Sequence, residues 1–317
     1  MEQKDYSQAL ENALYNWSKG GNSKPVMNAL KTGLANDMTV IVPFESPDGL
    51  IRTINPYVLN HGTIVTLEDN AVVNYHKLRI NKEAPDQFFL PVFTSEMQQQ
   101  RGQNSSCIVK PLNEMLEYIK NHKEYEGIII NPWERNLQLT KNVLLMVEKY
   151  KAESSINIIK GSVIDMHVDA IVNAANTTLL GGGGIDGAIH KAAGAGLLNE
   201  CRRLGGCRTG QAKITKAYDI RTAKAIIHTV GPIYDGSEQN KIDLAACYTN
   251  CLEIALKKNF SSIAFPGIST GVYGYPLNEA SRIAYETTAG WLKQHPDFIL
   301  DVYFVCFKDA EFAAFKF

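Results

Sequence analysis

The apolar run DAIVNAA at residues 169–175 constrains the fold of this chain more than any other stretch. A nearly continuous apolar run of this length is typical of a β-strand that is covered on both faces. Asn173 lies within the run, Asn176 follows it, and four successive glycines at 181–184 precede a helical pattern. A strand, a glycine-rich turn and a helix in this order predict one unit of a parallel α/β fold.

Strand and helix patterns alternate through the whole second half of the chain. Strands are expected at 156–161, 169–175, 223–231, 261–267 and 300–307, and helices at 185–193, 244–257 and 278–295. This alternation predicts a three-layer α/β/α sandwich with a mixed, largely parallel sheet.

The first half predicts a smaller α/β domain. Helices are expected at 5–18, 26–34, 94–102, 113–123 and 141–153, and strands at 39–44, 62–67, 72–75, 88–93, 107–112, 128–131 and 137–140. The polar stretch KAESS at 151–155 has no periodicity and predicts a domain junction. We therefore expect domains at 1–153 and 154–317.

Composition narrows the possible partners and the compartment. The 317 residues carry a formal net charge of −1 and no basic aromatic face, which disfavours nucleic acid as a partner. No apolar run approaches the roughly 20 residues of a spanning helix, so no membrane partner is expected. The polar start MEQKDYSQ does not resemble a signal peptide, and a cytoplasmic location is therefore expected. The six cysteines show no C-x-x-C spacing, which favours structural cysteines over zinc ligands.

Two glycine-rich loops, each after a strand and before a helix, predict an anion site. They are residues 181–184 and the stretch FPGISTGVYGYP at 265–276. Backbone N–H groups of glycines and helix amino termini at the carboxyl edge of one sheet can bind both phosphates of a diphosphate. A flexible turn is the alternative for either loop taken alone. The P-loop pattern is missing, and the G-x-G-x-x-G formed by Gly182, Gly184 and Gly187 lacks the acid that a Rossmann fold places about 20 residues later.

Asp186 has two interpretations from spacing alone. A carboxylate in the first turn of a helix stabilises the helix dipole. The same carboxylate beside an anion-binding loop can act in catalysis. His190, one turn later, and His228 in IIHTVGP are expected to be structural, although a dyad of Asp186 with His190 is an alternative.

The motifs of the second half, taken in order, resemble the macrodomain family. They are KGSVIDMHVDAIVNAANTTLLGGGGIDGAIHKAAG, CRTGQAKIT, IIHTVGP and IAFPGISTGVYGYP. The closest resemblance is to the MacroD-type branch, which hydrolyses mono-ADP-ribosyl groups and O-acetyl-ADP-ribose. It implies that Asn176 orients the distal ribose of ADP-ribose and that Asp186 positions the attacking water together with the substrate diphosphate. The ligand-binding residues that it implies are Ser162, Val163, Asn173, Gly182, Gly183, Gly184, Ile185, Ser269, Thr270, Gly271, Val272 and Tyr273.

One departure from the family concerns the base. Most macrodomains read G-D-I-T where this chain has Gly161, Ser162, Val163 and Ile164. The family's aspartate accepts a hydrogen bond from the adenine amino group, and Ser162 can accept one only without the strengthening effect of a charge. The zinc-dependent branch carries cysteine and histidine in its catalytic loop, whereas this chain has glycines there, so no metal and no cofactor are expected.

The first half resembles the amino-terminal domain of the SseB family, through FFLPVFTSEMQQQRG and EGIIINPWERNLQLT. The resemblance implies a protein-interaction module, with Trp133 either as an exposed contact or as a packed turn residue. The leading hypothesis for the whole chain is an ADP-ribosyl hydrolase acting on modified acidic side chains, on O-acetyl-ADP-ribose, or on both. The alternative is a reader that binds ADP-ribosylated proteins without turnover.

Overall fold

The computed structural model describes residues 6–45, 74–79, 88–101 and 105–317. The chain divides into two compact units, one formed by Met1–Tyr15 with Val26–Ala152 and the other by Asn16–Pro25 with Glu153–Phe317.

Among the described residues, the first part of the chain forms two small three-stranded sheets. β1 (Thr39–Glu45) pairs antiparallel with β2 (Asn74–Tyr75) and β4 (Ser106–Pro111). β5 (Tyr125–Ile130) pairs parallel with β3 (Phe88–Val92) and antiparallel with β6 (Leu137–Thr140). The helices of this part are α1 (Tyr6–Ser18), α2 (Lys24–Ala35), α3 (Glu96–Gln99), α4 (Leu112–Asn121) and α5 (Lys141–Lys149).

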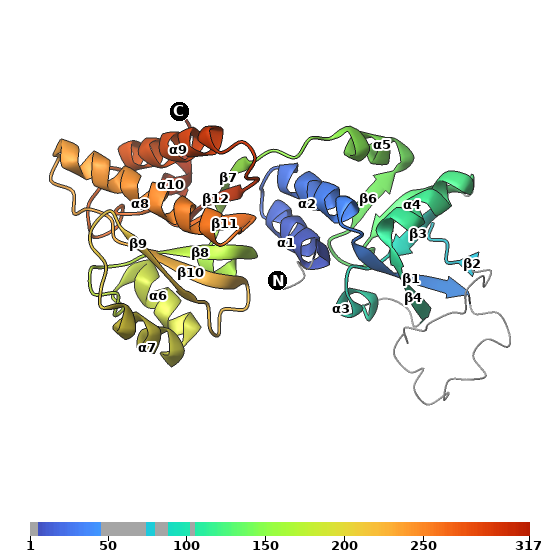
Figure 1. Cartoon of the computed structure of the whole chain (residues 1–317), viewed down its shortest axis with the longest axis horizontal. Helices are drawn as coiled ribbons and strands as arrows, with labels where there is room; N and C mark the ends of the chain where they lie inside the picture. Colours follow the sequence, from blue (N-terminus) through green and yellow to red (C-terminus); the bar gives the residue numbers. More distant parts are fainter. Residues whose placement is uncertain (1–5, 46–73, 80–87, 102–104) are drawn as a thin grey trace. The chain divides into compact units, whose positions relative to one another are not determined.

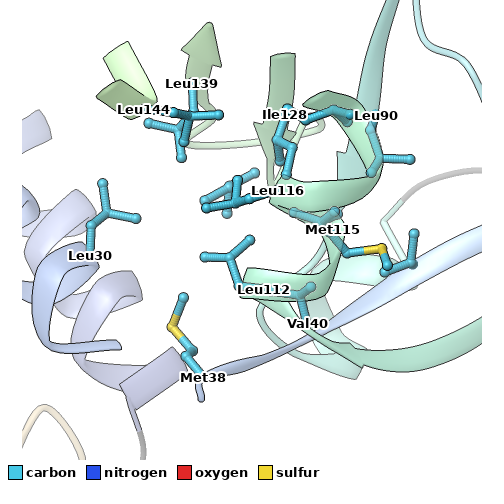
Figure 2. Packing of buried hydrophobic residues seen from close by; sticks show 14 of the residues in the cluster. Leu30, Met38, Val40, Leu90, Leu112, Met115, Leu116, Ile128, Leu139 and Leu144 are labelled. Carbon is cyan, nitrogen blue, oxygen red and sulfur yellow. The ribbon is translucent and has the colours of Figure 1, made fainter. Parts of the chain in front are cut away.

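One large apolar core joins both sheets to α1, α2, α4 and α5 (Figure 2), and a small separate cluster is formed by Ile41, Phe93 and Cys107. Helix α4 contributes Leu112, Met115, Leu116 and Ile119, which all lie on one face because the helix repeats every 3.6 residues. Leu90 of β3 and Ile128 of β5 belong to the same core. The sheets and helices of this part therefore stabilise one another rather than folding as separate hairpins.

The first part agrees with most of the predicted elements. Helix α5 ends at Lys149, four residues before the predicted end, and Tyr150 has the extended backbone of its C-cap. The strand predicted at 62–67 lies outside the described residues, and of the strand predicted at 72–75 only Asn74–Tyr75 is described.

The second unit contains a six-stranded sheet in the order β7-β12-β11-β8-β10-β9. Its strands are β7 (Ser155–Lys160), β8 (Val168–Ala174), β9 (Ala212–Lys216), β10 (Ala223–Thr229), β11 (Ser262–Phe265) and β12 (Asp301–Cys306). All neighbouring pairs are parallel except β9 with β10. The predicted mixed, largely parallel sheet is confirmed.

Helices cover both faces of this sheet (Figure 1). α8 (Glu238–Lys257) and α9 (Leu277–Gln294) share one core with Ala170 and Val172 of β8, while α6 (Gly184–Ala193) and α7 (Ala195–Leu204) share the other core with Ile171. This alternation follows from the two-residue period of a strand. It also directs the side chain of Asn173, two residues after Ile171, toward α6 and α7.

Three helices and one strand of the second unit differ from the predictions. α8 begins six residues before the predicted start, because its first six residues are mostly polar, with Ile242 as their only apolar side chain, and carry no apolar period. α7, β9 and the short helix α10 (Asp309–Ala313) were not predicted. Among the described residues, no helix is long and apolar enough to cross a membrane.

Candidate active site

The predicted site residues gather at one edge of the six-stranded sheet. In a parallel arrangement, the carboxyl ends of neighbouring strands lie at the same edge. Ser162 follows β7, Asn176 follows β8, and the loop containing Ser269 follows β11. Helix α6 begins at this edge with Gly184. The sheet therefore brings together segments that are more than a hundred residues apart in sequence.

Asp186 is held by two asparagine side chains. Its carboxylate is buried, with 4% of the residue exposed. The Nδ2 of Asn173 donates to Oδ1 across 2.7 Å, and the Nδ2 of Asn176 donates to Oδ2 across 3.4 Å. The N-cap residue of α6 is Gly183, which has no side chain to cap the helix, and Asp186 lies in the first turn, where its charge also stabilises the helix dipole. Both oxygens of this buried carboxylate therefore have a hydrogen-bond donor, as a buried polar group requires.

Asn176 also organises the turn that leads into the glycine run. Its Nδ2 donates to the carbonyl of Gly181 across 2.9 Å, and its Oδ1 accepts from the backbone N–H of Thr178 across 3.0 Å. The bond to Asp186 is the longest of these contacts and the weakest by geometry. It is therefore the bond that a ligand hydroxyl would replace most easily.

Asn173 is oriented in turn by His228 on the neighbouring strand. The two residues are register partners in β8 and β10, and Nδ2 of Asn173 lies 3.1 Å from Nδ1 of His228. Because the amide Nδ2 of Asn173 can only donate hydrogen bonds, Nδ1 of His228 must be the acceptor. The other ring nitrogen, Nε2, lies 2.9 Å from Oγ1 of Thr215 and donates to it in that tautomer.

Burial keeps this histidine neutral. His228 is fully buried, and desolvation, with a smaller contribution from His190, lowers its pKa to about 3. A protonated ring could not accept from Asn173, so the low pKa and the hydrogen-bond direction agree. His228 was expected to be structural, and its contacts lie beneath the site and not in it.

The glycine run approaches both Asp186 and the start of α6. A Cβ on Gly182 would lie 3.1 Å from Oδ2 of Asp186, and a Cβ on Gly187 would lie 2.4 Å from the carbonyl oxygen of Gly182. Gly187 therefore has to be glycine for the loop to close onto the helix. In contrast, nothing lies within 4 Å of a Cβ on Gly183 or Gly184, and both residues are exposed. This part of the loop therefore leaves open space against its own backbone.

The second glycine-rich loop carries a buried hydroxyl without a partner. Ser269 has a backbone φ of 64° and is 7% exposed, and its Oγ makes no hydrogen bond within the described residues. The loop is tied to the segment after β10, since the N–H of Tyr234 donates to the carbonyl of Tyr273 across 2.8 Å. Thr270 and Tyr273 are half-buried, Gly271 is exposed, and Val272 is fully exposed.

The far end of the edge is formed by β7 and β12. The Oγ of Ser162 accepts from the N–H of Ile164 across 3.4 Å and caps a short 3-10 turn at Val163–Asp165. Val163 is 2% exposed, so its side chain belongs to the core. Phe307, directly after β12, is 78% exposed and was not singled out from the sequence. The sequence does contain a signal that could have identified Phe307, because it is an aromatic residue directly after an apolar strand that ends at the ligand edge.

The remaining predicted residues differ in how deeply they are buried. Asn173 is completely buried and reaches the site through Asp186. Ile185 is half-buried at the start of α6. The Nε2 of His190 lies 3.6 Å from Oδ1 of Asp186 and has no hydrogen-bond partner among the described residues. Within that same part of the chain, no group of three or more histidine, cysteine, aspartate or glutamate side chains is arranged to hold a metal ion.

Comparisons with known proteins agree with this architecture. The family model described as Macro domain matches residues 172–284. A macro domain-containing protein of Chlorobaculum tepidum is 50% identical over 162 residues, which cover 51% of this chain and 93% of that protein. An O-acetyl-ADP-ribose deacetylase of Cronobacter sakazakii is 46% identical over 166 residues, covering 51% of this chain and 91% of that protein.

A further relative and a solved structure cover the same half of the chain. The ADP-ribose glycohydrolase MACROD2 of Xenopus laevis is 51% identical over 163 residues, and the match spans only 39% of that longer protein. The Oceanobacillus iheyensis macrodomain with ADP is 40% identical and covers 51% of this chain and 88% of that one, with a TM-score of 0.49. Through its second half, the chain belongs to the macro domain family.

Proposed function

We propose that this protein is an ADP-ribosyl hydrolase that releases mono-ADP-ribose from modified acidic side chains and removes the acetyl group from O-acetyl-ADP-ribose. The observation that carries the proposal is the buried carboxylate of Asp186, held between Asn173 and Asn176 beside the open glycine loop. A carboxylate placed there has little use in a protein that only binds its ligand. The names of the MACROD2 and deacetylase relatives, at 51% and 46% identity, support the same reaction class.

ADP-ribose would lie along the carboxyl edge of the sheet. The diphosphate would bind backbone amides of Gly182, Gly183, Gly184 and Ile185 in the first loop and of Ser269, Thr270, Gly271, Val272 and Tyr273 in the second. The unpaired Oγ of Ser269 supplies a further donor. The adenine would lie at the β7–β12 end, where Ser162 and the backbone of Val163 meet its edge and Phe307 offers a flat ring face for stacking.

The distal ribose would then lie over Asn176 and Asp186. Asp186 accepts a hydrogen bond from a water molecule and takes its proton as the water oxygen attacks the anomeric carbon. The bond from that carbon to the acceptor carboxylate breaks, and the acceptor leaves with the electron pair. For O-acetyl-ADP-ribose, the same water attacks the acetyl carbonyl carbon and the bond from that carbon to the ribose oxygen breaks. The ribose oxygen leaves with the electron pair and takes the proton from Asp186, and acetate is released. General-base assistance of this kind contributes about 10²–10⁴-fold in rate.

The test is to incubate the protein with an acceptor protein that is mono-ADP-ribosylated on glutamate and to quantify free ADP-ribose. We expect release by wild type and a loss of about 10²-fold or more in Asp186→Asn, which keeps the size of the side chain but cannot take the proton. Asp186→Asn should still bind ADP-ribose in calorimetry. Binding by wild type without any release would contradict hydrolysis and support the reader alternative.

Two further proposals concern the whole chain. Residues 1–153 would serve as a protein-interaction module that delivers the macro domain, residues 154–317, to a partner. Exposed Met97 and Trp133 support a contact surface in that part. Cross-linking with Met97→Ser and Trp133→Ser as comparison variants tests this role. Cell fractionation tests the proposed cytoplasmic location.

A further inference from the structure

Three arginines lie at the end of α7 and in the turn that follows it, which packs against the turn after Asn176. The segment 200–216 carries five basic side chains and one acidic side chain. Three arginines of this segment, Arg202, Arg203 and Arg208, are exposed, and they are called the basic rim below. Arg202 and Arg203 lie in the last turn of α7, and Arg208 follows in the turn after it.

The turn that carries Arg208 is fixed next to Asn176. The N–H of Cys207 donates to the carbonyl of Thr177 across 2.9 Å, and a Cβ on Gly206 would lie 2.7 Å from the same oxygen. Thr177 directly follows Asn176, so this contact joins the turn that carries Arg208 to the residue that would orient the ribose. On β9, Nζ of Lys213 donates to the carbonyl of Leu204 across 2.6 Å and connects the end of α7 to this strand.

The sheet order places the basic rim beyond the reacting sugar. Along the edge, the β7–β12 end comes first, the Ser269 loop after β11 comes next, and Asn176 after β8 follows. The ends of β10 and β9 lie on the other side of β8, and the basic rim belongs to that side. A ligand whose base lies at β7–β12 and whose diphosphate lies at the Ser269 loop has its distal ribose at β8. Whatever is attached to that ribose extends toward the basic rim.

Among the described residues, no carboxylate forms an ion pair with an arginine of the basic rim. Arg202 donates to the side chain of Asn199, a neutral group. Arg203 and Arg208 form no hydrogen bond or ion pair through their side chains with any residue that the structure describes. The nearby carboxylate of Glu200 accepts from Lys216 N and the Tyr218 hydroxyl, and that of Asp243 accepts from the side chain of Gln239.

We propose that the basic rim docks an acidic protein segment, so that the preferred substrates are proteins whose ADP-ribosylated glutamate or aspartate lies among further acidic residues. This inference rests on the proposed hydrolase function. A guanidinium binds a carboxylate through two parallel hydrogen bonds, which suits arginine to this recognition. A small substrate such as O-acetyl-ADP-ribose does not reach the basic rim.

The experiment compares three substrates. Two peptides carry ADP-ribose on a single glutamate, one flanked by aspartates and the other by lysines, and the third substrate is O-acetyl-ADP-ribose. The triple variant Arg202→Gln, Arg203→Gln, Arg208→Gln removes the basic rim. The matched control Lys257→Gln, Lys258→Gln, Lys293→Gln removes the same charge from the exposed ends of α8 and α9, which precede β11 and β12 at the opposite edge of the sheet.

Wild type should show a kcat/KM about tenfold higher for the acidic peptide than for the basic one, because three partly exposed ion pairs each contribute a factor of about two. This preference should decline between 50 and 500 mM salt, where screening weakens exposed pairs. The triple arginine variant should lose the preference and hydrolyse O-acetyl-ADP-ribose at the wild-type rate, which also shows that it is folded. The lysine control should behave like wild type on all three substrates.

Several results would overturn the proposal. A wild type that treats both peptides equally, or an arginine variant that keeps the preference, removes the basis for docking. An equal loss on O-acetyl-ADP-ribose would mean that the arginines act on ADP-ribose itself. If the variant instead loses binding of a fluorescent single-stranded oligonucleotide, the basic rim serves nucleic acid. If wild type hydrolyses none of the three substrates, the hydrolase function fails first and this inference fails with it.

Discussion

The side-chain amide of Asn173 donates to the carboxylate of Asp186 across 2.7 Å, from the middle layer of the fold to the helix above it. Asn173 lies at the end of β8 and Asp186 lies in the first turn of α6, with the glycine loop between them. The contact exists because the side chain of Asn173 points to the same face of the sheet as Ile171, beneath α6 and α7. The buried strand thus directly sets the orientation of the proposed catalytic carboxylate.

Replacing Asn173 by aspartate should change the pH dependence of turnover. Two carboxylates at this separation cannot both be ionised, so one of them takes up a proton near neutral pH. We expect hydrolysis at pH 7 to fall by about 10–100-fold and to recover partly as the pH is raised. The rate of O-acetyl-ADP-ribose hydrolysis by the variant, measured between pH 6 and 9.5, tests this pH dependence. Asn173→Ala serves as the control, because it removes the hydrogen bond without adding a charge; the same alkaline shift in both variants would contradict the explanation.

The buried neutral His228 should destabilise the second unit in acid. Its pKa is about 3 in the folded protein and near 6.5 in the unfolded chain, so only the unfolded chain gains a proton between these values. The stability contribution is therefore constant above about pH 6.5 and is lost as the pH falls below it. Between pH 7.5 and 5.0 the loss is about 2 kcal/mol.

Urea unfolding of wild type and of His228→Gln at these two pH values measures this loss. Glutamine does not titrate, so the free energy of unfolding of the variant should depend less on pH by about the same 2 kcal/mol. The variant should be less stable than wild type at pH 7.5, where the neutral histidine carries no penalty. Parallel pH dependences in the two proteins would be inconsistent with a depressed pKa for His228.

Ser269→Ala should weaken ADP-ribose binding without destabilising the fold. The Oγ of Ser269 is buried and has no partner among the described residues, so its removal leaves no protein group unsatisfied. If the hydroxyl donates to a phosphate oxygen, its loss should lower affinity about tenfold or more. Calorimetry with ADP-ribose gives the affinity. Thr288→Val is the matched control, since Oγ1 of Thr288 on α9 is likewise buried and unpaired; an equal effect of both changes would mean that the loss is structural.

Ser162→Asp should tighten ADP-ribose binding. Aspartate caps a helical turn as well as serine does, so the short turn at Val163–Asp165 should persist. A charged acceptor strengthens the hydrogen bond to the adenine amino group, and we expect a gain in affinity of roughly fivefold. Ser162→Asn provides a neutral residue of the same size that also caps. Equal affinities of Ser162→Asp and Ser162→Asn would show that charge at this position has no effect on the base.

Most of the candidate site could be predicted from the sequence, because its residues follow strands and precede helices. Asn176, Asp186 and the two glycine-rich loops each lie in a local pattern that also fixes their place at the sheet edge. Elements with weak local patterns were missed for physical reasons. α7 buries only Leu197 and Cys201 and is bounded by Gly194 and Gly205, and β9 is a short edge strand with a half-exposed pattern.

The sequence by itself determined the α/β class of the second half, the order of its longer strands and helices with strong apolar patterns, and the residues available at the carboxyl edge. These follow from apolar periodicity and from turn residues, which act over a few positions. Only the tertiary structure decided which of those residues touch. The register of β8 and β10 brings Asn173 to His228, and the turn after α7 brings Arg208 beside the turn of Asn176. Such contacts depend on strand order and on which face a side chain takes, and neither is encoded within the few residues of a motif.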